Sequence, residues 1–328
     1  MRKHFSIPLT MLLLIATAHS QPQARRIYCC MYQTPAPGSI KMLRPVYIGV
    51  AASTDFGATW KSMGWRTNRT NDIACDPAKP AQLYLANDYG LLVSRDEGTT
   101  WKLATSDSIP GVLSVKAFGD TVLLGTPTGV FVSADRGATF TQRNSGLRAL
   151  NGTYVSSVLP LRGVWFAGTA DGVYRSSDAG ASWHASGLAG KAVDRMVAGP
   201  VGTDILAAWN ARDGIWLSED RGKSWSSYAS ALPTRLVQAV LFPTTDKRTV
   251  IVATKDQGVL RTNDGGATWT NSSGGMQNLN VTALARDPED EALLWAGTEN
   301  GVYLSDNRGA TWKLSALQLG YVSNISIW

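Results

Sequence analysis

Ser133-Ala134-Asp135-Arg136-Gly137-Ala138-Thr139-Phe140 is the third of seven copies of one eight-residue motif. Gly occupies the fifth position of every copy, Thr or Ser the seventh, and an aromatic residue ends each copy. The third positions are Asp55, Asp96, Asp135, Asp178, Asp220, Asp264 and Asn307, and they lie 41, 39, 43, 42, 44 and 43 residues apart. A repeat of about 40–45 residues is typical of the blades of a β-propeller.

Each repeat unit contains short apolar segments before the motif. In the last full unit these segments are residues 281–285, 293–297 and 302–305, and Asn300-Gly301 joins the last two. Asn-Gly is a strong hairpin signal because both residues tolerate positive φ. A further strand begins at the aromatic residue of the motif, which gives four strands per unit. The sequence therefore predicts an all-β fold, a single seven-bladed β-propeller with four-stranded antiparallel blades.

Both ends of the chain contribute to one blade. Residues 27–32 and 46–50 precede the first motif, but no innermost strand precedes them. Residues 319–328 resemble the first strand of a unit, yet no blade follows them. We expect this C-terminal strand to complete blade one and to close the ring, which leaves no exposed sheet edge. The alternative is that residues 319–328 form a tail.

The motif has a structural explanation. Asp in a turn accepts hydrogen bonds from the backbone N–H groups ahead of it, Gly takes a conformation that a Cβ forbids, and the aromatic residue packs inward. Calcium binding is the competing explanation. One carboxylate per copy falls short of the six to eight oxygen ligands that calcium requires. We expect the motif to be structural, and we expect no metal and no cofactor.

The seven motifs resemble Asp-box, or BNR, repeats. This family includes sialidases, xyloglucan-type glycoside hydrolases, sortilin-like receptor ectodomains and photosystem II assembly factors of the Ycf48 type. The resemblance covers residues 45–328 and implies a sialidase-like propeller whose motifs lie on one face, in the turn between the third and fourth strands. It also implies that ligands bind on the opposite face. It selects no single function, because a fold does not determine function.

The N-terminus has the pattern of a secretory signal peptide. Arg2 and Lys3 precede an apolar run over residues 7–18, and small residues lead up to position 20. We expect cleavage near residue 20, secretion to the periplasm or the extracellular space, and a propeller over residues 21–328. The alternative is an uncleaved anchor, although the run is shorter than the roughly 20 apolar residues that span a bilayer.

Charge, histidine and cysteine content limit the chemistry. Loss of Arg2 and Lys3 reduces the net charge from +6 to +4, too weak an excess to imply a nucleic-acid partner. His184 is the one histidine of three that lies beyond residue 20, which disfavours triads and multi-histidine zinc sites. The cysteines are Cys29, Cys30 and Cys75, and an odd number indicates one bridge and one free thiol without fixing the pairing.

The loops of the face opposite the motifs carry the candidate ligand-binding residues. Several cations on one face favour an anionic partner, such as a carboxylate, a uronic acid or an acidic protein surface. Ordinary surface charge is the alternative. A tryptophan at a loop tip is a platform for a sugar ring or an apolar side chain, unless it packs between blades. The candidates are Trp65, Arg66, Arg148, Arg195, Trp209, Arg212 and Arg235.

Two functions fit this pattern. The first is a secreted, monomeric, non-catalytic propeller that binds a protein or a polysaccharide, as a recognition or assembly scaffold, with no membrane span. The alternative is a glycoside hydrolase of the sialidase or xyloglucanase kind, which needs two carboxylates flanking one bond. Asp72 and Asp194 are the candidate pair, and Asp171 and Asp213 lie in similar positions. We favour the binding function, and whether any catalysis occurs stays open.

Overall fold

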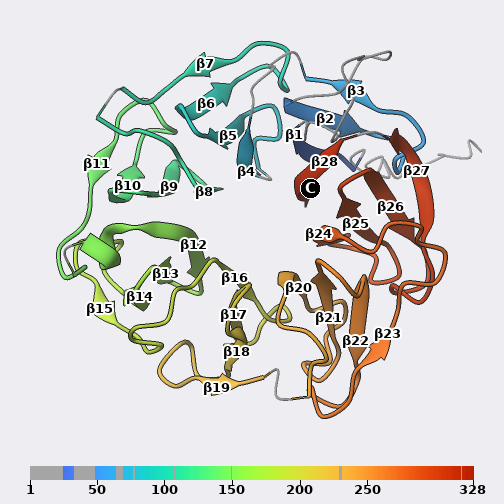
Figure 1. Ribbon diagram of the computed structural model, residues 1–328. Helices are drawn as coiled ribbons and strands as arrows, with labels where there is room; N and C mark the ends of the chain where they lie inside the picture. Colours follow the sequence, from blue (N-terminus) through green and yellow to red (C-terminus); the bar gives the residue numbers. More distant parts are fainter. Residues whose placement is uncertain are drawn as a thin grey trace, which may run out of the picture.

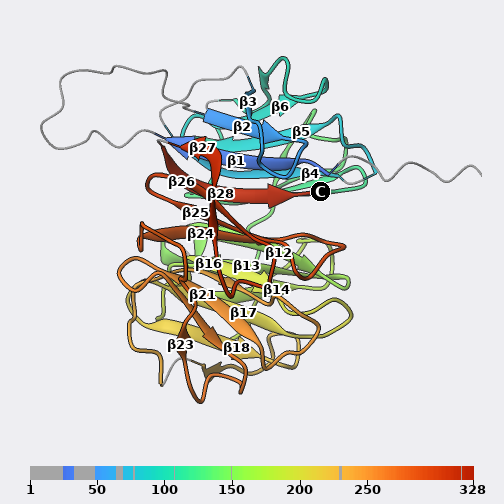
Figure 2. The ribbon, with the colours of Figure 1, turned by 90° about the vertical axis from the view of Figure 1, so that its right-hand side faces the viewer.

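The fold is a ring of seven β-sheets around a central axis. The computed structural model describes residues 25–32, 49–63, 69–76, 78–106, 108–148, 150–228, 231–318 and 320–328. Every sheet has four antiparallel strands, and Figures 1 and 2 show the ring face-on and edge-on. The prediction of a seven-bladed propeller is confirmed. Residues 1–20, the proposed signal peptide, lie outside the described residues.

Each blade is a meander whose first strand lies nearest the axis. In order from blade 1 to blade 7, the first strands are β28 (Tyr321–Ile327), β4 (Thr70–Cys75), β8 (Ser114–Phe118), β12 (Val155–Leu161), β16 (Arg195–Ala198), β20 (Val237–Leu241) and β24 (Val281–Arg286). The second strands are β1 (Ile27–Tyr32), β5 (Leu83–Asn87), β9 (Thr121–Thr126), β13 (Val164–Thr169), β17 (Leu206–Asn210), β21 (Val250–Thr254) and β25 (Leu294–Thr298).

The outer half of each blade contains a third strand that ends in the motif and a fourth strand at the rim. The third strands are β2 (Gly49–Ser53), β6 (Gly90–Ser94), β10 (Gly129–Ser133), β14 (Gly172–Ser176), β18 (Gly214–Ser218), β22 (Val259–Thr262) and β26 (Gly301–Ser305). The fourth strands are β3 (Lys61–Ser62), β7 (Lys102–Leu103), β11 (Thr141–Gln142), β15 (His184–Ala185), β19 (Ser226–Ser227), β23 (Thr270–Asn271) and β27 (Lys313–Gln318).

Helical structure is minimal in the described part of the chain. It consists of the 3-10 turn η1 (Leu150–Thr153), which precedes β12. Among the described residues, no helix is long and apolar enough to cross a membrane.

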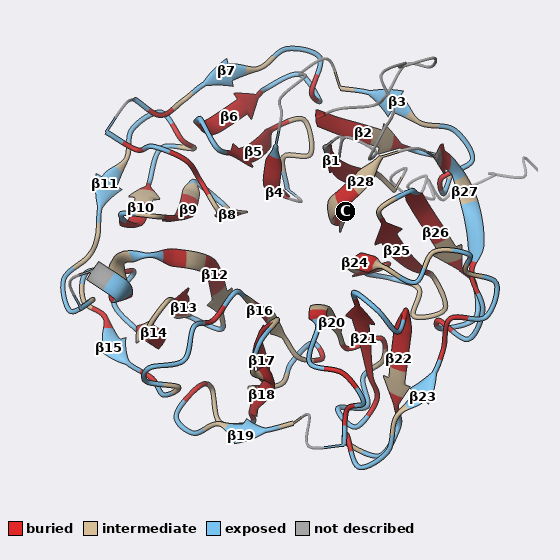
Figure 3. Ribbon diagram, viewed as in Figure 1, coloured by how far each residue is buried: buried red, intermediate tan, exposed pale blue. Residues whose placement is uncertain are grey.

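The C-terminal strand closes the ring as expected. β28 pairs with β1 from Ile27↔Ile327 to Tyr32↔Tyr321, so the sheet order in blade 1 is β28-β1-β2-β3. Val322 and Ile325 of this strand are buried in the core that blade 1 shares with blade 7. The hydrophobic cores lie within and between the blades, and exposed residues concentrate at the rim strands and the loops (Figure 3).

The motif forms a compact hydrogen-bonded turn between the third and fourth strands. In blade 3, Thr139 donates to Asp135 through both its backbone N–H and its hydroxyl, at 2.9 and 2.6 Å. Ser133 Oγ donates to Asp135 Oδ1 at 2.6 Å and accepts from the Gly137 N–H at 2.7 Å. The donated bonds from Ser133 and Thr139 lower the pKa of Asp135 to about 2, because they stabilise its charged form.

The alternation of turns gives the ring two distinct faces. The motif face carries the seven motifs and the turns between first and second strands. The cavity face carries the turns between second and third strands and the loops that lead from one blade to the next.

Hydrogen bonds join neighbouring blades near the axis, close to the cavity face. The first strands of several blades contain a β-bulge near their first residues, and bulges re-aim side chains. A polar residue at or near this point then donates to a backbone carbonyl of the next blade. These bonds are Asn71 Nδ2 to Val112 O (2.9 Å), Ser156 Oγ to Val193 O, Thr282 Oγ1 to Val322 O (2.5 Å) and Ser323 Oγ to Thr70 O (2.7 Å).

The expectation of one disulfide is wrong: Cys29, Cys30 and Cys75 are buried free thiols. Cys29 and Cys30 are adjacent in β1, so their side chains point to opposite faces of the sheet. Cys30 lies beside Thr70 at the start of β4, whereas Cys75 ends that strand. A strand rises about 3.3 Å per residue, so the distance along β4 from Thr70 to Cys75 exceeds the roughly 7 Å that can separate the Cα atoms of a disulfide. Cys30 and Cys75 are therefore too far apart to be bridged.

Candidate functional site

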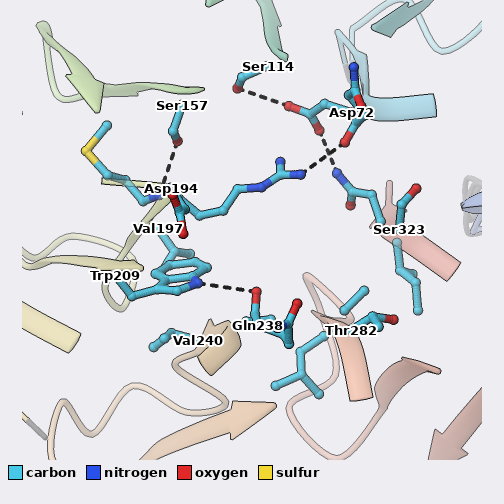
Figure 4. A pocket seen from close by; sticks show the side chains of 18 of the residues that line it. Asp72, Ser114, Ser157, Asp194, Val197, Trp209, Gln238, Val240, Thr282 and Ser323 are labelled. Atoms are coloured by element: carbon cyan, nitrogen blue, oxygen red, sulfur yellow. Dashed lines mark hydrogen bonds between the residues drawn. The ribbon is translucent and has the colours of Figure 1, made fainter. Parts of the chain in front are cut away.

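A cavity of about 430 Å³ lies on the axis of the propeller. The first strand of every blade contributes to its wall, so the cavity is a property of the whole ring (Figure 4). Arg69, Asp194 and Ala211 also line the cavity, and they belong to or adjoin loops of the cavity face. The cavity therefore opens on the face opposite the motifs.

Asp72 is a buried carboxylate that joins three blades at the cavity wall. Its side chain belongs to β4 in blade 2 and is 2% exposed. Ser114 Oγ and the Val115 N–H of blade 3 donate to Oδ2 at 3.2 and 3.0 Å, and Lys116 Nζ lies 3.0 Å from the same oxygen. Asn324 Nδ2 of blade 1 donates to Oδ1 at 2.7 Å. Both oxygens of Asp72 are therefore occupied by protein donors.

The charge state of Asp72 follows from these neighbours. Burial raises the pKa of this carboxyl, but the charges of Lys116 and Arg195 and the bond from the Val115 N–H outweigh burial, so the net shift is downward. Asp72 is therefore ionised at neutral pH, and it is unsuited to donate a proton.

Arg195 reaches across the cavity from the first position of β16. Its Nη2 donates to the backbone oxygen of Asn71 at 3.2 Å, which joins blade 5 to blade 2. The side-chain amide of Asn71 is also engaged. Its Nδ2 donates to Val112 O and, at 3.1 Å, to Asp88 Oδ1. Arg195 therefore adds a positive charge to the lining of the cavity.

Asp194 and Asp72 line the same cavity in different environments. Asp194 is exposed at the mouth, where its Oδ2 accepts the Ala211 N–H at 3.2 Å. Asp72 is buried and fully bonded. The structure brings the two predicted carboxylates to one cavity, with only Asp194 open to an incoming molecule.

Trp209 does not lie at a loop tip. β17 extends through Asn210, so Trp209 is a strand residue, and it is 5% exposed. Its ring packs in the core shared by blades 5 and 6, and its Nε1 donates to Gln238 O at 3.2 Å. Packing between blades, the alternative considered for this residue, is its observed role, although one edge of it lines the cavity.

The other predicted arginines that the structure describes lie in loops of the cavity face, in blades 4 to 6. Arg148, Arg212 and Arg235 are exposed and do not line the cavity. Arg148 pairs with Asp171 at 3.1 Å, and Arg235 Nη1 donates to Asp213 O at 3.1 Å. Trp65 and Arg66 lie outside the described residues.

Several residues of the cavity wall are absent from the sequence-based candidates. Lys116, Gln238 and Asn324 belong to first strands, whereas the sequence predicts the ligand-binding residues in the loops. The alternation of Ser114 and Lys116 along one strand is a signal that would have found the polar side of β8. Among the described residues there is no group of three or more His, Cys, Asp or Glu side chains that could hold a metal.

Large apolar side chains are exposed on the cavity face beyond the cavity. Tyr89 is 68% exposed at the hairpin tip of blade 2, and Tyr154 is 44% exposed before β12. Leu236 and Leu279 are exposed at the starts of blades 6 and 7. The cavity face thus combines a polar centre with scattered apolar groups around it.

Comparisons with known proteins agree with this architecture. The family model described as sortilin, neurotensin receptor 3, matches residues 213–323. A xyloglucanase of Hypocrea jecorina (strain QM6a) is 25% identical over 291 residues, which cover 82% of this chain and 34% of the xyloglucanase. The resemblance to this group of propellers is confirmed.

Solved structures show the same fold. The GH74 xyloglucanase of Xanthomonas campestris matches with a TM-score of 0.66 at 19% identity, over 83% of this chain and 52% of that one. YCF48 bound to D1 peptide matches with a TM-score of 0.58 at 15% identity, over 84% of this chain and 86% of that one. The propeller thus spans about half or less of each xyloglucanase, and most of the YCF48 chain.

Proposed function

We propose that this chain is a secreted recognition propeller that binds a protein or glycan partner on its cavity face without catalysis. The observation that carries the proposal is the bonding of Asp72. A glycosidase of the two-carboxylate kind needs one protonated acid and one carboxylate free to act on sugar or water. Asp72 is ionised, and both of its oxygens are held by residues of blades 1 and 3. It acts as a connector of blades.

The chemistry of the cavity face supports binding. Arg195 and Asp194 offer a charge of each sign, and Gln238 adds an amide that lines the cavity. Tyr89 and Tyr154 provide exposed aromatic surface outside it. Such a mixture of polar groups and aromatic anchors is typical of surfaces that recognise peptides and sugars. A YCF48 structure that contains a D1 peptide, and the xyloglucanases, supply one precedent for each partner class.

Peptide and glycan arrays test the binding function. The purified chain is applied to both arrays, and each hit is measured by calorimetry. We expect Arg195→Glu and Arg235→Glu to weaken binding of the hit at least about tenfold, as loss of a charge-assisted hydrogen bond would. Arg162→Glu, on the motif face, is the matched control and should bind normally. Equal loss in all three variants, or in none, would refute the cavity face as the binding surface.

A glycoside hydrolase remains the second candidate, because Asp194 is exposed at the mouth of the cavity and a curated relative is a xyloglucanase. Xyloglucan, other polysaccharides and aryl glycosides are incubated with the chain, and reducing ends are measured. We expect no turnover. Turnover that is lost in both Asp194→Asn and Asp72→Asn would establish the hydrolase and end the binding-only proposal.

A further inference from the structure

The motif of blade 7 differs from the others in its use of charge. In blades 3 and 5 the residue after the motif aspartate is an arginine that pairs with an acid in the turn between the first two strands. Arg136 lies 2.6 Å from Asp120, and Arg221 lies 2.9 Å from Asp204. The two acids hold these arginines in ion pairs on the motif face.

Blade 7 has the same arginine without its acid. The backbone N–H of Arg136 bonds to Asp120 O, and that of Arg221 to Asp204 O, which identifies equivalent positions in the two blades. The backbone N–H of Arg308 bonds to Ala292 O at 3.0 Å, so Ala292 stands where blades 3 and 5 have aspartate. Arg308 is exposed and has no ion pair within the described part of the chain.

The motif carboxylate is missing at the same place. In the other six copies the Thr or Ser hydroxyl donates to the aspartate, as in blade 3. In blade 7, Asn307 Oδ1 accepts the Thr311 N–H at 2.9 Å, which fixes the orientation of the amide. Asn307 Nδ2 then donates to Thr311 Oγ1 at 2.7 Å. The Thr311 hydroxyl oxygen is thus an acceptor here, and no acceptor for its hydrogen is recorded among the described residues.

A second guanidinium approaches from blade 6. Arg261 Nη1 donates to the backbone oxygen of Arg308 at 2.6 Å, and its Nε donates to Asn263 Oδ1 at 2.9 Å, so the Arg261 guanidinium lies against the backbone of Arg308. Like Arg308, Arg261 is in none of the ion pairs recorded among the described residues. Burial, and then the charge of Arg308, lower the pKa of Arg261. The nearby acids are engaged elsewhere: Asp306 lies 3.0 Å from Lys313, and Glu291 accepts the Thr245 N–H at 3.1 Å.

We infer that Arg261, Arg308 and the Thr311 hydroxyl form a binding site for the oxyanion of a sulfate or phosphate ester on the motif face. Two guanidinium groups match the charge and the several oxygens of such a group, because each presents its donors in a fixed fork. The site is on the face opposite the cavity. It therefore goes beyond the proposed function and stands or falls separately from it.

Titration with inorganic sulfate and inorganic phosphate at constant ionic strength, followed by amide NMR shifts, tests the site. We expect saturable shifts centred on residues 307–311 and 261. Ala292→Asp should raise the Kd at least about tenfold, because it restores the acid found in blades 3 and 5, and Arg308→Ala should do the same. Arg221→Ala is the matched control and should bind like the unmodified chain. Thermal unfolding verifies that each variant is folded.

The source of the oxyanion is distinguished with paired sugars. Glucosamine 6-sulfate is compared with glucosamine, and glucose 6-phosphate with glucose. Tighter binding of either ester than of its parent sugar, abolished by Ala292→Asp, supports the site and identifies the group. Equal binding of ester and parent sugar, or equal anion binding by the unmodified chain and Ala292→Asp, overturns the inference.

Discussion

The two faces of this ring come from the same repeat, yet they use charge differently. Eleven of the fourteen ion pairs recorded among the described residues lie on the motif face, and several of them join neighbouring blades, as Arg26–Glu97 and Lys247–Glu219 do. The cavity face has two, Arg148–Asp171 and Lys191–Asp213, besides the one inside the cavity. The motif face thus uses its charges to hold the blades together, and the cavity face leaves more of them accessible to a partner.

Removal of residues 321–328 should disrupt the structure of both faces of the ring, which is the largest effect we expect. β28 supplies the first strand of blade 1, so its loss leaves the inner edge of β1 unpaired and removes Val322 and Ile325 from the core that blades 1 and 7 share. The truncated chain should lose its cooperative urea transition and its near-ultraviolet circular dichroism. An unchanged urea midpoint would mean that ring closure contributes nothing to stability.

Asp72→Ala should cost about 3–5 kcal/mol of unfolding free energy, the cost of removing one partner of a buried ion pair. The substitution leaves Lys116 and Asn324 without their acceptor at the junction of three blades. Urea denaturation measures the change. Asp194→Ala, at the exposed mouth, is the control and should stay within about 0.5 kcal/mol of the unmodified chain. Similar losses in both variants would contradict the distinction between a connecting and an accessible carboxylate.

The carboxylates of the motif face should make the stability of the ring acid-sensitive. The pKa values of Asp55, Asp135, Asp220 and Asp264 are lowered to about 2, first by hydrogen bonds from the Ser or Thr side chains of the motif. Because these values lie below the unfolded value near 3.9, the stability they contribute is present above about pH 4 and is lost as the pH falls toward 2.

Asp135→Asn tests this acid dependence, since blade 7 already has Asn at this position. Urea midpoints at pH 5 and pH 3 should differ less in the variant than in the unmodified chain. Asn307→Asp, the reverse exchange, should enlarge the difference. Identical pH dependence in all three proteins would show that ionisation of the motif carboxylates does not affect the stability of the fold.

The smallest effect on stability is expected for Arg235→Glu on the cavity face. This side chain is exposed, and its recorded bond is to the backbone oxygen of Asp213. The unfolding free energy should change by no more than about 0.5 kcal/mol, as for most surface substitutions. A loss above about 1 kcal/mol, measured in urea, would assign Arg235 to the framework instead of the binding surface.

The sequence predicted the fold because each motif marks one blade and its spacing counts them. It predicted the closing strand as well, since residues 319–328 look like a first strand without a blade. Most residues of the cavity wall could not be predicted from the sequence. Bulges near the start of β4, β20 and β24 shift the alternation of side chains, so the strand residues that face the axis cannot be read from polarity alone.

Trp209 and Lys116 illustrate the same limit. The sequence analysis predicts Trp209 at a loop tip, but β17 continues to Asn210 and buries the ring. Lys116 belongs to the strand β8, so it is not among the candidates predicted in the loops. Its ion-pair partner is Asp72 of the preceding blade. Contacts between blades depend on the register of their strands and on the distances between blades. The sequence of a single repeat does not determine either.

The pairing of the two described chain ends has a practical consequence. Arg26 and Trp328 exchange backbone hydrogen bonds at 2.9 and 3.1 Å, so they lie side by side where β1 begins and β28 ends, on the motif face. A short linker between them would permit circular permutation, with new ends opened in any loop between blades. A tag or reporter fused at Trp328 would project away from the cavity, and a surface coated through that tag would display the cavity face outward.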